Sequence, residues 1–281
     1  MSEACALQSL VEHVRAAAPY RHVDTGLVER LAREALAMGL SGKDALKQTR
    51  RRLHQVATVY QARPQYPQWL ERLRAARQSG DPALLREACR TIMGAHQSSR
   101  ERLPILERFY SEIMQGLAPV RSVLDLACGL GPLAVPWMPL ATGAHYWARD
   151  IFTDLTDFVG AALPLLGVQG DAATADLLQG VSAPRAQVAL LLKTIPCLEQ
   201  LDRNVGPWLL RQVPAERVVV TFPTSSLGGR RDRGMISNYR ARMEQICAEL
   251  PWPVREVVFA SELAYLVDKR DDGPKEDVHA L

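Results

Sequence analysis

The chain is built around the stretch Ser122-Val-Leu-Asp-Leu-Ala-Cys-Gly-Leu-Gly-Pro-Leu-Ala-Val135. Apolar residues lead into Asp125 and then into a turn of small residues that contains Gly129 and Gly131. Pro132 follows where a helix would begin, which suits proline because an N–H in the first helical turn has no partner to lose. The stretch therefore predicts a strand, a glycine turn and a helix, a geometry that lets the backbone approach a nucleoside cofactor closely.

Two kinds of nucleotide-binding turn share this pattern. The spacing Asp-x-Ala-x-Gly-x-Gly over residues 125–131 resembles the first motif of Rossmann-like S-adenosylmethionine (SAM) methyltransferases, with Ala127 in place of the first glycine. The stretch also contains Gly-x-Gly-x-x-Ala, the looser dinucleotide fingerprint, which ends at Ala134. Asp125 favours SAM because a carboxylate there can organise the methionine end through its ammonium group. Pro132 favours SAM because it removes an N–H that a pyrophosphate would need. A glycine turn that only tightens a strand–helix corner is the structural alternative.

Length and cysteine usage predict a soluble protein of the cytoplasm. The 281 residues suffice for one large domain or two small ones. Five scattered cysteines without a C-x-x-C pair argue against a disulfide framework and against a zinc site, and they suit a reducing compartment. The N-terminus has no basic-then-apolar signal pattern, and no window approaches the length of about eighteen apolar residues that a membrane span needs. We therefore expect no metal and no membrane contact. A monomer is expected too, although no sequence feature specifies the oligomeric state.

Positive charge is concentrated in the first part of the chain. Residues 1–110 contain 18 Lys and Arg against 11 Asp and Glu, whereas residues 111–281 contain 16 against 20. A basic front half suggests a module that meets a polyanion. A set of solvated Arg-rich helices is the alternative.

The first half of the chain predicts only helices. Apolar residues at helical spacing run from Leu7 to Val14 until Pro19 stops them. Further helices are expected over residues 25–38, from a cap at Ser41 to about residue 60, and over residues 69–77, 82–93 and 98–115, with a loop at 63–67.

The second half alternates between strand and helix patterns. Strands are expected over residues 122–126, 145–148, 167–170, 188–192 and 217–222, with helices at 133–140 and 155–166 and a terminal hairpin at 254–259 and 263–267. This order predicts an α/β fold, a Rossmann-like class I SAM methyltransferase sheet with a terminal antiparallel hairpin, preceded by an all-helical N-terminal domain. We place the helical domain at residues 1–108 and the methyltransferase domain at 109–281, with a disordered tail from 269.

Two further aspartates lie at predicted strand ends. Asp150 comes 19 residues after Gly131, where an acid can accept hydrogen bonds from ribose hydroxyls. Asp176 follows the next strand and suits an adenine amino group, with Leu177 against the ring face. Each aspartate alone is more often a cap or turn residue. Together with Asp125, at the ends of successive strands beside a glycine turn, they favour a cofactor site.

Four stretches together resemble the aminoglycoside-resistance 16S ribosomal RNA methyltransferases. They are His96-Gln-Ser-Ser-Arg-Glu-Arg102-Leu-Pro, the glycine turn from Asp125, Leu191-Leu-Lys-Thr-Ile-Pro-Cys-Leu-Glu199 and Val220-Thr-Phe-Pro-Thr-Ser-Ser-Leu-Gly-Gly-Arg230. The resemblance spans residues 43–269. It implies SAM-dependent methylation of N7 of the guanosine at position 1405 of 16S rRNA, within the assembled 30S subunit, and hence resistance to aminoglycosides.

The resemblance also implies cofactor contacts. The segment that closes over the cofactor corresponds to His96, Gln97, Ser98, Ser99, Arg100, Glu101 and Arg102, and Arg102 is placed to pair with the SAM carboxylate. The other implied contacts are Tyr60, Ala127, Gly129, Asp150, Asp176, Leu177 and Leu192. The family often has Gln where this chain has Leu201, so Gln200 is included as a candidate replacement. The structural alternatives are a helix i,i+4 partner for Arg102, a solvated lysine for Lys193 and an interior histidine for His96.

The chemistry of guanine N7 limits what a site must contain. N7 carries a free lone pair, so its attack on a methyl group needs no general base, and we predict no catalytic acid or base. The base must leave its stack, and the candidates for positioning it are Lys193, Glu199, Ser225 and Ser226. Candidate RNA-binding residues are Lys43, Lys47, Arg50 and Arg51 on one helix face, with Arg230 and Arg231 as a second cluster.

Two rival functions remain open at this point. One is a SAM methyltransferase of another RNA or of a small molecule, with the helical half as a lid. The spread of basic charge over the helical half argues against a small-molecule enzyme, because a lid over a small-molecule site is usually apolar. The other is a non-catalytic RNA-binding protein with a vestigial SAM fold. This alternative is disfavoured because the chain retains the candidate cofactor residues Asp125, Asp150, Asp176 and Arg102.

Overall fold

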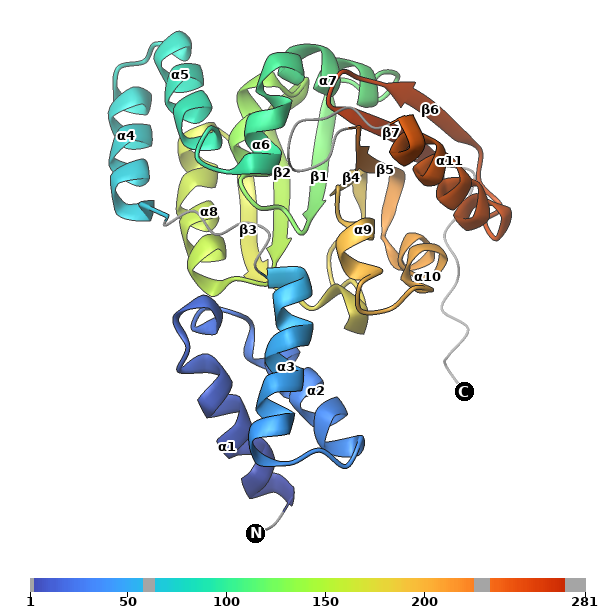
Figure 1. The fold of residues 1–281 in the computed structure, drawn as a ribbon. Coiled ribbons are helices and arrows are strands. Elements are labelled where there is room, and N and C mark those ends of the chain that lie inside the picture. Colours follow the sequence, from blue (N-terminus) through green and yellow to red (C-terminus); the bar gives the residue numbers. More distant parts are fainter. Residues whose placement is uncertain (1–2, 58–63, 225–232, 271–281) are drawn as a thin grey trace, which may run out of the picture.

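Seven strands form one sheet in the order β3-β2-β1-β4-β5-β7-β6 (Figure 1). The computed structural model describes residues 3–57, 64–224 and 233–270. The strands are β1 (Val120–Leu126), β2 (Leu140–Asp150), β3 (Gln169–Thr174), β4 (Ala186–Leu192), β5 (Ala215–Pro223), β6 (Val254–Val258) and β7 (Glu262–Asp268).

The sheet is parallel from β3 to β5, and β7 lies antiparallel between β5 and β6. This arrangement confirms the predicted class I methyltransferase sheet with its antiparallel ending. It differs from the wholly parallel sheet of a dinucleotide-binding fold.

Both faces of the sheet are buried, which explains the continuous apolar runs of the central strands. Successive side chains point to opposite faces. Val188 and Leu190 join one core cluster, while Ala189 and Leu191 join another. The first cluster is covered by α4 (Tyr66–Gln78), α5 (Pro82–Met93), α7 (Leu106–Ile113) and α8 (Thr153–Leu166). The second is covered by α9 (Ile195–Leu198), α10 (Val205–Gln212) and α11 (Arg233–Ala248). The sequence analysis did not predict α9, α10 or α11.

The element after the glycine turn differs from the prediction. A helix was expected over residues 133–140, but the chain forms a 3-10 helix, η3 (Gly131–Trp137), and β2 already begins at Leu140. Pro136 lies inside this segment and has no N–H to donate, so an α-helical ladder cannot continue through it. The expected strand at 167–170 is likewise displaced to Gln169–Thr174. Gly167 instead ends α8 (Thr153–Leu166) in the left-handed region.

Three N-terminal helices have a core of their own. They are α1 (Glu3–Arg15), α2 (Thr25–Ala37) and α3 (Gly42–Ala57), and they pack around Val14, Leu31 and Leu53. We call them the α1–α3 unit. In Figure 1 this unit, drawn in blue, lies beyond the ends of β1, β2 and β3. The predicted extension of the third helix to Tyr60 falls outside the described residues.

The remaining helices of the first half share their core with the sheet. They are α4, α5 and α7, and the short polar helix α6 (Gln97–Arg102) lies between α5 and α7 in the chain. Tyr66 was expected in a loop but starts α4, because Pro67 falls in the first turn, where proline is tolerated. The helix expected over 98–115 is interrupted by a 3-10 turn at Leu103–Ile105, which contains Pro104. The domain boundary at residue 108 stays a prediction.

None of the helices in the described part of the chain is long and apolar enough to cross a membrane.

Candidate cofactor and RNA site

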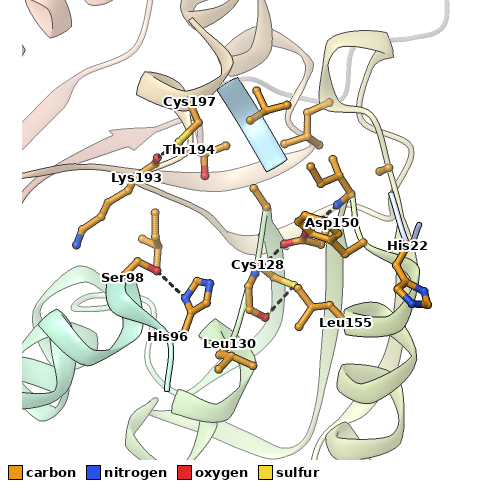
Figure 2. Close-up of a pocket in the computed structure, with 18 of the residues that line it drawn as sticks. His22, His96, Ser98, Cys128, Leu130, Asp150, Leu155, Lys193, Thr194 and Cys197 are labelled. Carbon is orange, nitrogen blue, oxygen red and sulfur yellow. Dashed lines mark hydrogen bonds between the residues drawn. The ribbon is translucent and has the colours of Figure 1, made fainter. Parts of the chain in front are cut away.

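A cavity of about 530 Å³ lies at the carboxyl ends of β1 to β4 (Figure 2). Open α/β sheets bind ligands at this edge, and the volume falls within the range of about 300–1,000 Å³ of small-molecule pockets. Its wall combines the glycine turn after β1, the loops after β2 and β3, the residues after β4, and the segment that leads into α6.

The glycine turn is shaped by two close approaches. Gly129 has φ +51°, and its N–H donates to Asp150 Oδ2 at 2.9 Å, while the His96 ring lies 3.5 Å from where a Cβ would stand. At Gly131 a Cβ would lie 2.7 Å from Asp125 Oδ2. Any side chain at Gly131 would therefore collide with a buried carboxylate. This collision explains why the turn needs glycine at this position.

Asp125 lies beneath this turn and does not line the cavity. It is 2% exposed and accepts a hydrogen bond from the Tyr146 hydroxyl at 2.7 Å. Burial raises the pKa of Asp125 to about 7, although the Tyr146 hydrogen bond and the nearby Arg102 lower it in part. The structure thus places Asp125 under the glycine turn, and its expected part in organising the methionine end of SAM stays a prediction.

Asp150 and Asp176 both line the cavity, together with Leu177 and Leu192. Asp150 accepts from Gly129 N and, at 2.7 Å, from Ile151 N, and burial raises its pKa despite these bonds. Asp176 caps the short 3-10 helix η4 (Leu177–Gln179) by accepting from Leu178 N at 3.1 Å. The two carboxylates therefore stand on neighbouring loops of one pocket, as their positions at strand ends predicted.

Four residues of the segment from His96 to Arg102 line one side of the cavity. His96, Ser98, Ser99 and Arg102 line it, whereas Gln97, Arg100 and Glu101 do not. Figure 2 shows the hydrogen-bonded pair Ser98 Oγ and His96 Nδ1, 3.2 Å apart. Burial, and then the charges of Arg102 and Lys193, lower the pKa of His96 to about 4. The ring is therefore neutral at pH 7.

Two buried cations stand beside this segment. Arg102 is 3% exposed, and its Nε lies 2.7 Å from Glu262 Oε1 at the start of β7. Lys193 Nζ lies 2.6 Å from Glu101 Oε2 and 3.7 Å from Glu262 Oε1. The Lys193 ion pair lowers the pKa of Glu101 although burial opposes this. Neither cation fits the structural alternatives, because Arg102 pairs across the fold and Lys193 is not solvated.

The backbone at Lys193 is unusual. Its φ is +61°, in the left-handed region that a residue with a Cβ adopts only at a cost of about 1–3 kcal/mol. Ala127, which follows the neighbouring strand β1, has φ +54°. Strain of this kind persists where the surrounding structure holds it, and it gathers at functional sites.

Several predicted site residues lie elsewhere or outside the described residues. Glu199 does not line the cavity, and it accepts from Arg242 Nε at 2.7 Å. Leu201, not Gln200, lines the wall. Arg50 is half-buried and donates to His13 O at 2.8 Å, while Lys43, Lys47 and Arg51 are exposed. Outside the described residues lie Tyr60, Ser225, Ser226, Arg230 and Arg231.

The sequence analysis did not find the contribution of the helices to the wall. Pro19, His22 and Val56 of the N-terminal part line the cavity, as do Tyr66 and Trp69 at the start of α4. The Tyr66 ring stacks on Phe158 of α8 at 5.0 Å between centroids. No local pattern marks these residues, because they reach the cavity only through packing of helices on the sheet.

This wall fits SAM by its chemistry. Acidic oxygens stand at the two strand ends where a ribose and an adenine amino group need acceptors, and Leu177 supplies an apolar surface beside them. A buried guanidinium, Arg102, also lines the cavity, and a guanidinium is a suitable partner for a carboxylate. Within the described ranges, no group of three or more His, Cys, Asp or Glu side chains is arranged to hold a metal ion.

Comparison with known proteins gives the family. Residues 15–266 match the family described as ribosomal RNA methyltransferase (FmrO). The 16S rRNA (guanine(1405)-N(7))-methyltransferase of Micromonospora rosea is 41% identical over 253 residues, which cover 89% of this chain and 92% of that protein. The protein of the same name from Frankia casuarinae is 37% identical over 270 residues, 95% of each chain. The crystal structure of the 16S rRNA methyltransferase RmtF in complex with S-adenosyl-L-homocysteine is 33% identical, with a TM-score of 0.75 over 95% of this chain and 99% of RmtF. This chain belongs to the FmrO family of ribosomal RNA methyltransferases.

Proposed function

We propose that this chain transfers a methyl group from SAM to N7 of the guanine at position 1405 of 16S rRNA. The substrate is the RNA within the assembled 30S subunit, the protein acts as a monomer in the cytoplasm, and the modified ribosome resists aminoglycosides. The observation that carries the proposal is the cavity at the strand ends, with its two acids and its buried arginine, in a chain 41% identical to a methyltransferase of that name.

Each wall residue has a task in holding the cofactor. Asp150 accepts hydrogen bonds from the ribose, while its second role, accepting from Gly129 N, keeps the glycine turn in place. Asp176 accepts from the adenine amino group, with Leu177 against the ring. Arg102 binds the carboxylate of SAM, and the Arg102 Nε is held by an ion pair with Glu262.

SAM supplies a methyl group bound to a positively charged sulfur. His96 is neutral at pH 7 and so adds no repulsive charge to a cavity that takes this cation. The wall also excludes water over much of its area, since Leu177, Leu192 and Leu201 line it. Placing N7 in line with the methyl group in such a site accelerates the reaction without a general base.

Lys193 is the described residue best placed to position the extruded guanine. It follows β4 at the cavity edge, its backbone is held in the left-handed region, and Glu101 fixes its ammonium group. Glu199 is bound to Arg242 instead, and we assign it a structural part in holding α9 against α11.

The exposed face of α3 is the proposed contact with ribosomal RNA. Lys43, Lys47 and Arg51 follow one another at four-residue spacing, so they stand in one row on the helix. Arg50 is excluded from this row because it holds α1 through the His13 carbonyl. The row belongs to the α1–α3 unit, from which Pro19, His22 and Val56 line the cavity, so RNA bound there would lie next to the site of chemistry.

An assay with tritiated SAM tests the proposal. Purified protein is incubated with 30S subunits, with protein-free 16S rRNA and without RNA, and the methylated nucleotide is mapped by chain cleavage at 7-methylguanosine. We expect incorporation with 30S subunits at position 1405 and little with the other two. An Asp150→Ala variant, assayed at a SAM concentration that saturates the parent but not the variant, serves as the control with reduced incorporation. Methylation at another nucleotide, or equal methylation of protein-free rRNA, would contradict the proposal.

A further inference from the structure

The α1–α3 unit is fastened to the loop that carries Asp176. Arg30 of α2 lies with its Nε 2.7 Å from Asp176 Oδ2, and the two side chains are 17% and 9% exposed. Arg30 is separated from Asp176 by 146 residues in the chain. The attraction within an ion pair that is largely removed from solvent is screened less by water and salt than the attraction within a surface pair.

Arg30 is itself held by a chain of charged groups. Its Nη1 lies 2.7 Å from Glu34 Oε1, and the other oxygen of Glu34 lies 3.3 Å from Arg52 Nη2 on α3. Arg52 also donates to the carbonyl of Leu201 at 3.3 Å, and the Leu201 side chain lines the cavity. The network therefore joins α2 and α3 to two separate parts of the cavity wall.

The loop after Asp150 is tied to the same unit through its backbone. Asp24 N donates to Ile151 O at 2.7 Å, and Thr153 N donates to His22 O at 2.8 Å. Val23 and Phe152 form an isolated antiparallel bridge between these bonds. Both carboxylates of the cofactor site thus stand on loops that the α1–α3 unit contacts directly.

We propose that Arg30 is a positioning residue for the cofactor, which acts by holding the Asp176 carboxylate toward the adenine. The inference rests on the adenine-binding role proposed above for Asp176. Each carboxylate oxygen can accept two hydrogen bonds. Arg30 occupies one site on Oδ2 and Leu178 N one site on Oδ1, so acceptor capacity remains for the adenine amino group. Without Arg30, the bond from Leu178 N would be the one hydrogen bond from the described residues that orients this carboxylate.

A consequence is that the affinity for RNA and the affinity for the cofactor should depend on one another. The row of basic residues on α3 and the Arg30 side chain belong to one packed unit, so a shift of that unit on binding RNA would be passed to Asp176 through Arg30. Linkage then requires that bound cofactor changes RNA affinity by the same factor as bound RNA changes cofactor affinity.

The first test compares two ligands on one variant. Arg30→Met removes the charge and keeps much of the apolar stem, and Arg33→Met, at an exposed arginine of the same helix, is the matched control. The dissociation constants of S-adenosylhomocysteine, and of its analogue with hydrogen in place of the adenine amino group, are measured by calorimetry.

We expect Arg30→Met to weaken S-adenosylhomocysteine about 5- to 10-fold and the analogue less than about twofold, a difference of roughly 1 kcal/mol at the amino group. Arg33→Met should change neither. Equal weakening of both ligands would show a merely structural role and overturn the proposal, as would unchanged binding of S-adenosylhomocysteine. Asp176→Ala separates the two claims: if it too weakens both ligands equally, the adenine assignment of Asp176 fails. If it discriminates and Arg30→Met does not, only the inference about Arg30 fails.

The second test measures the linkage. Affinity for 30S subunits is determined with and without saturating S-adenosylhomocysteine, for the parent chain, Arg30→Met and Arg33→Met. We expect the affinity for 30S subunits to differ several-fold with and without the cofactor product in the parent and in Arg33→Met. In Arg30→Met the difference should be smaller but not abolished, because the backbone bonds from Asp24 and to His22 remain. The same fold-difference in all three proteins would overturn the linkage.

Discussion

Arg102 Nε lies 2.7 Å from Glu262 Oε1, and the two side chains are 3% and 0% exposed although 160 residues separate them in the chain. The pair joins α6, which covers the cavity, to the first residue of β7. A buried ion pair contributes little net stability compared with apolar residues, but removing one partner leaves a charge without compensation. Glu262 therefore fixes where the Arg102 guanidinium stands.

Changing Glu262 to Met should destabilise the fold by about 3–5 kcal/mol, because Arg102 would stay buried without its carboxylate. The free energy of unfolding from urea titration measures this. The double variant Arg102→Met/Glu262→Met should recover most of the loss, since both charges are then gone. If the double variant were as unstable as the single one, packing at these positions, and not the ion pair, would dominate.

Changing Asp150 to Ala should weaken SAM binding by roughly 1–3 kcal/mol, through lost charge-assisted hydrogen bonds to the ribose. Asp150→Asn should lose less, because its amide oxygen can still accept from Gly129 N. Calorimetry gives both affinities, and thermal melting checks that the variants are folded. Unchanged SAM affinity in Asp150→Ala would remove Asp150 from the cofactor site.

The buried Asp125 predicts a pH dependence of stability. Burial raises its pKa to about 7, so between about pH 4 and pH 7 the folded chain keeps a proton that the unfolded chain has released. Its contribution to stability is therefore present at low pH and is lost as the pH rises through this window, by up to about 4 kcal/mol. An Asp125→Asn variant has no such proton to lose.

Urea titrations of the parent and of Asp125→Asn at pH 5 and pH 8 measure this contribution. As the pH rises from 5 to 8, the variant should gain stability relative to the parent. The contributions of other titrating groups cancel in this comparison. If the unfolding free energies of the parent and Asp125→Asn differed by the same amount at both pH values, Asp125 would not change its charge in this window.

The strands and the cofactor edge could be predicted because their signals are local. Continuous apolar runs such as 188–192 mark strands buried on both faces, and they appear where expected. Once the strands are parallel, residues at their carboxyl ends must gather at one edge. This is why Asp150 and Asp176 were found from sequence and line one cavity.

The pairs that complete the site could not be predicted in this way. Arg30 meets Asp176 and Arg102 meets Glu262 over more than 140 residues, and no spacing rule connects residues so far apart. Arg50 shows the same limit at shorter range. Helical periodicity places it on the basic face, but whether it reaches solvent or the His13 carbonyl depends on how α1 packs against α3.

The final prediction concerns the basic row on α3. Lys47 and Arg51 are exposed and are separated by one helical turn, so they can meet phosphates without any change of fold. A double change to Glu should leave thermal melting and SAM affinity unaltered. Arg50 is left intact, because losing its bond to His13 O would disturb the α1–α3 unit itself.

Affinity of this variant for 30S subunits should fall by an order of magnitude or more, and the salt dependence should flatten by about one unit of slope for each lost phosphate contact. The matched control is Arg121→Glu/Arg185→Glu, which makes the same change of charge at exposed residues near the starts of β1 and β4, at the opposite edge of the sheet from the cavity. Binding at several salt concentrations gives affinity and slope for both variants. Because net charge is matched, a loss confined to the α3 variant identifies a contact and not a general repulsion. An equal loss in both variants would mean that α3 acts only through overall charge, and no loss in either would move the RNA contact away from this helix.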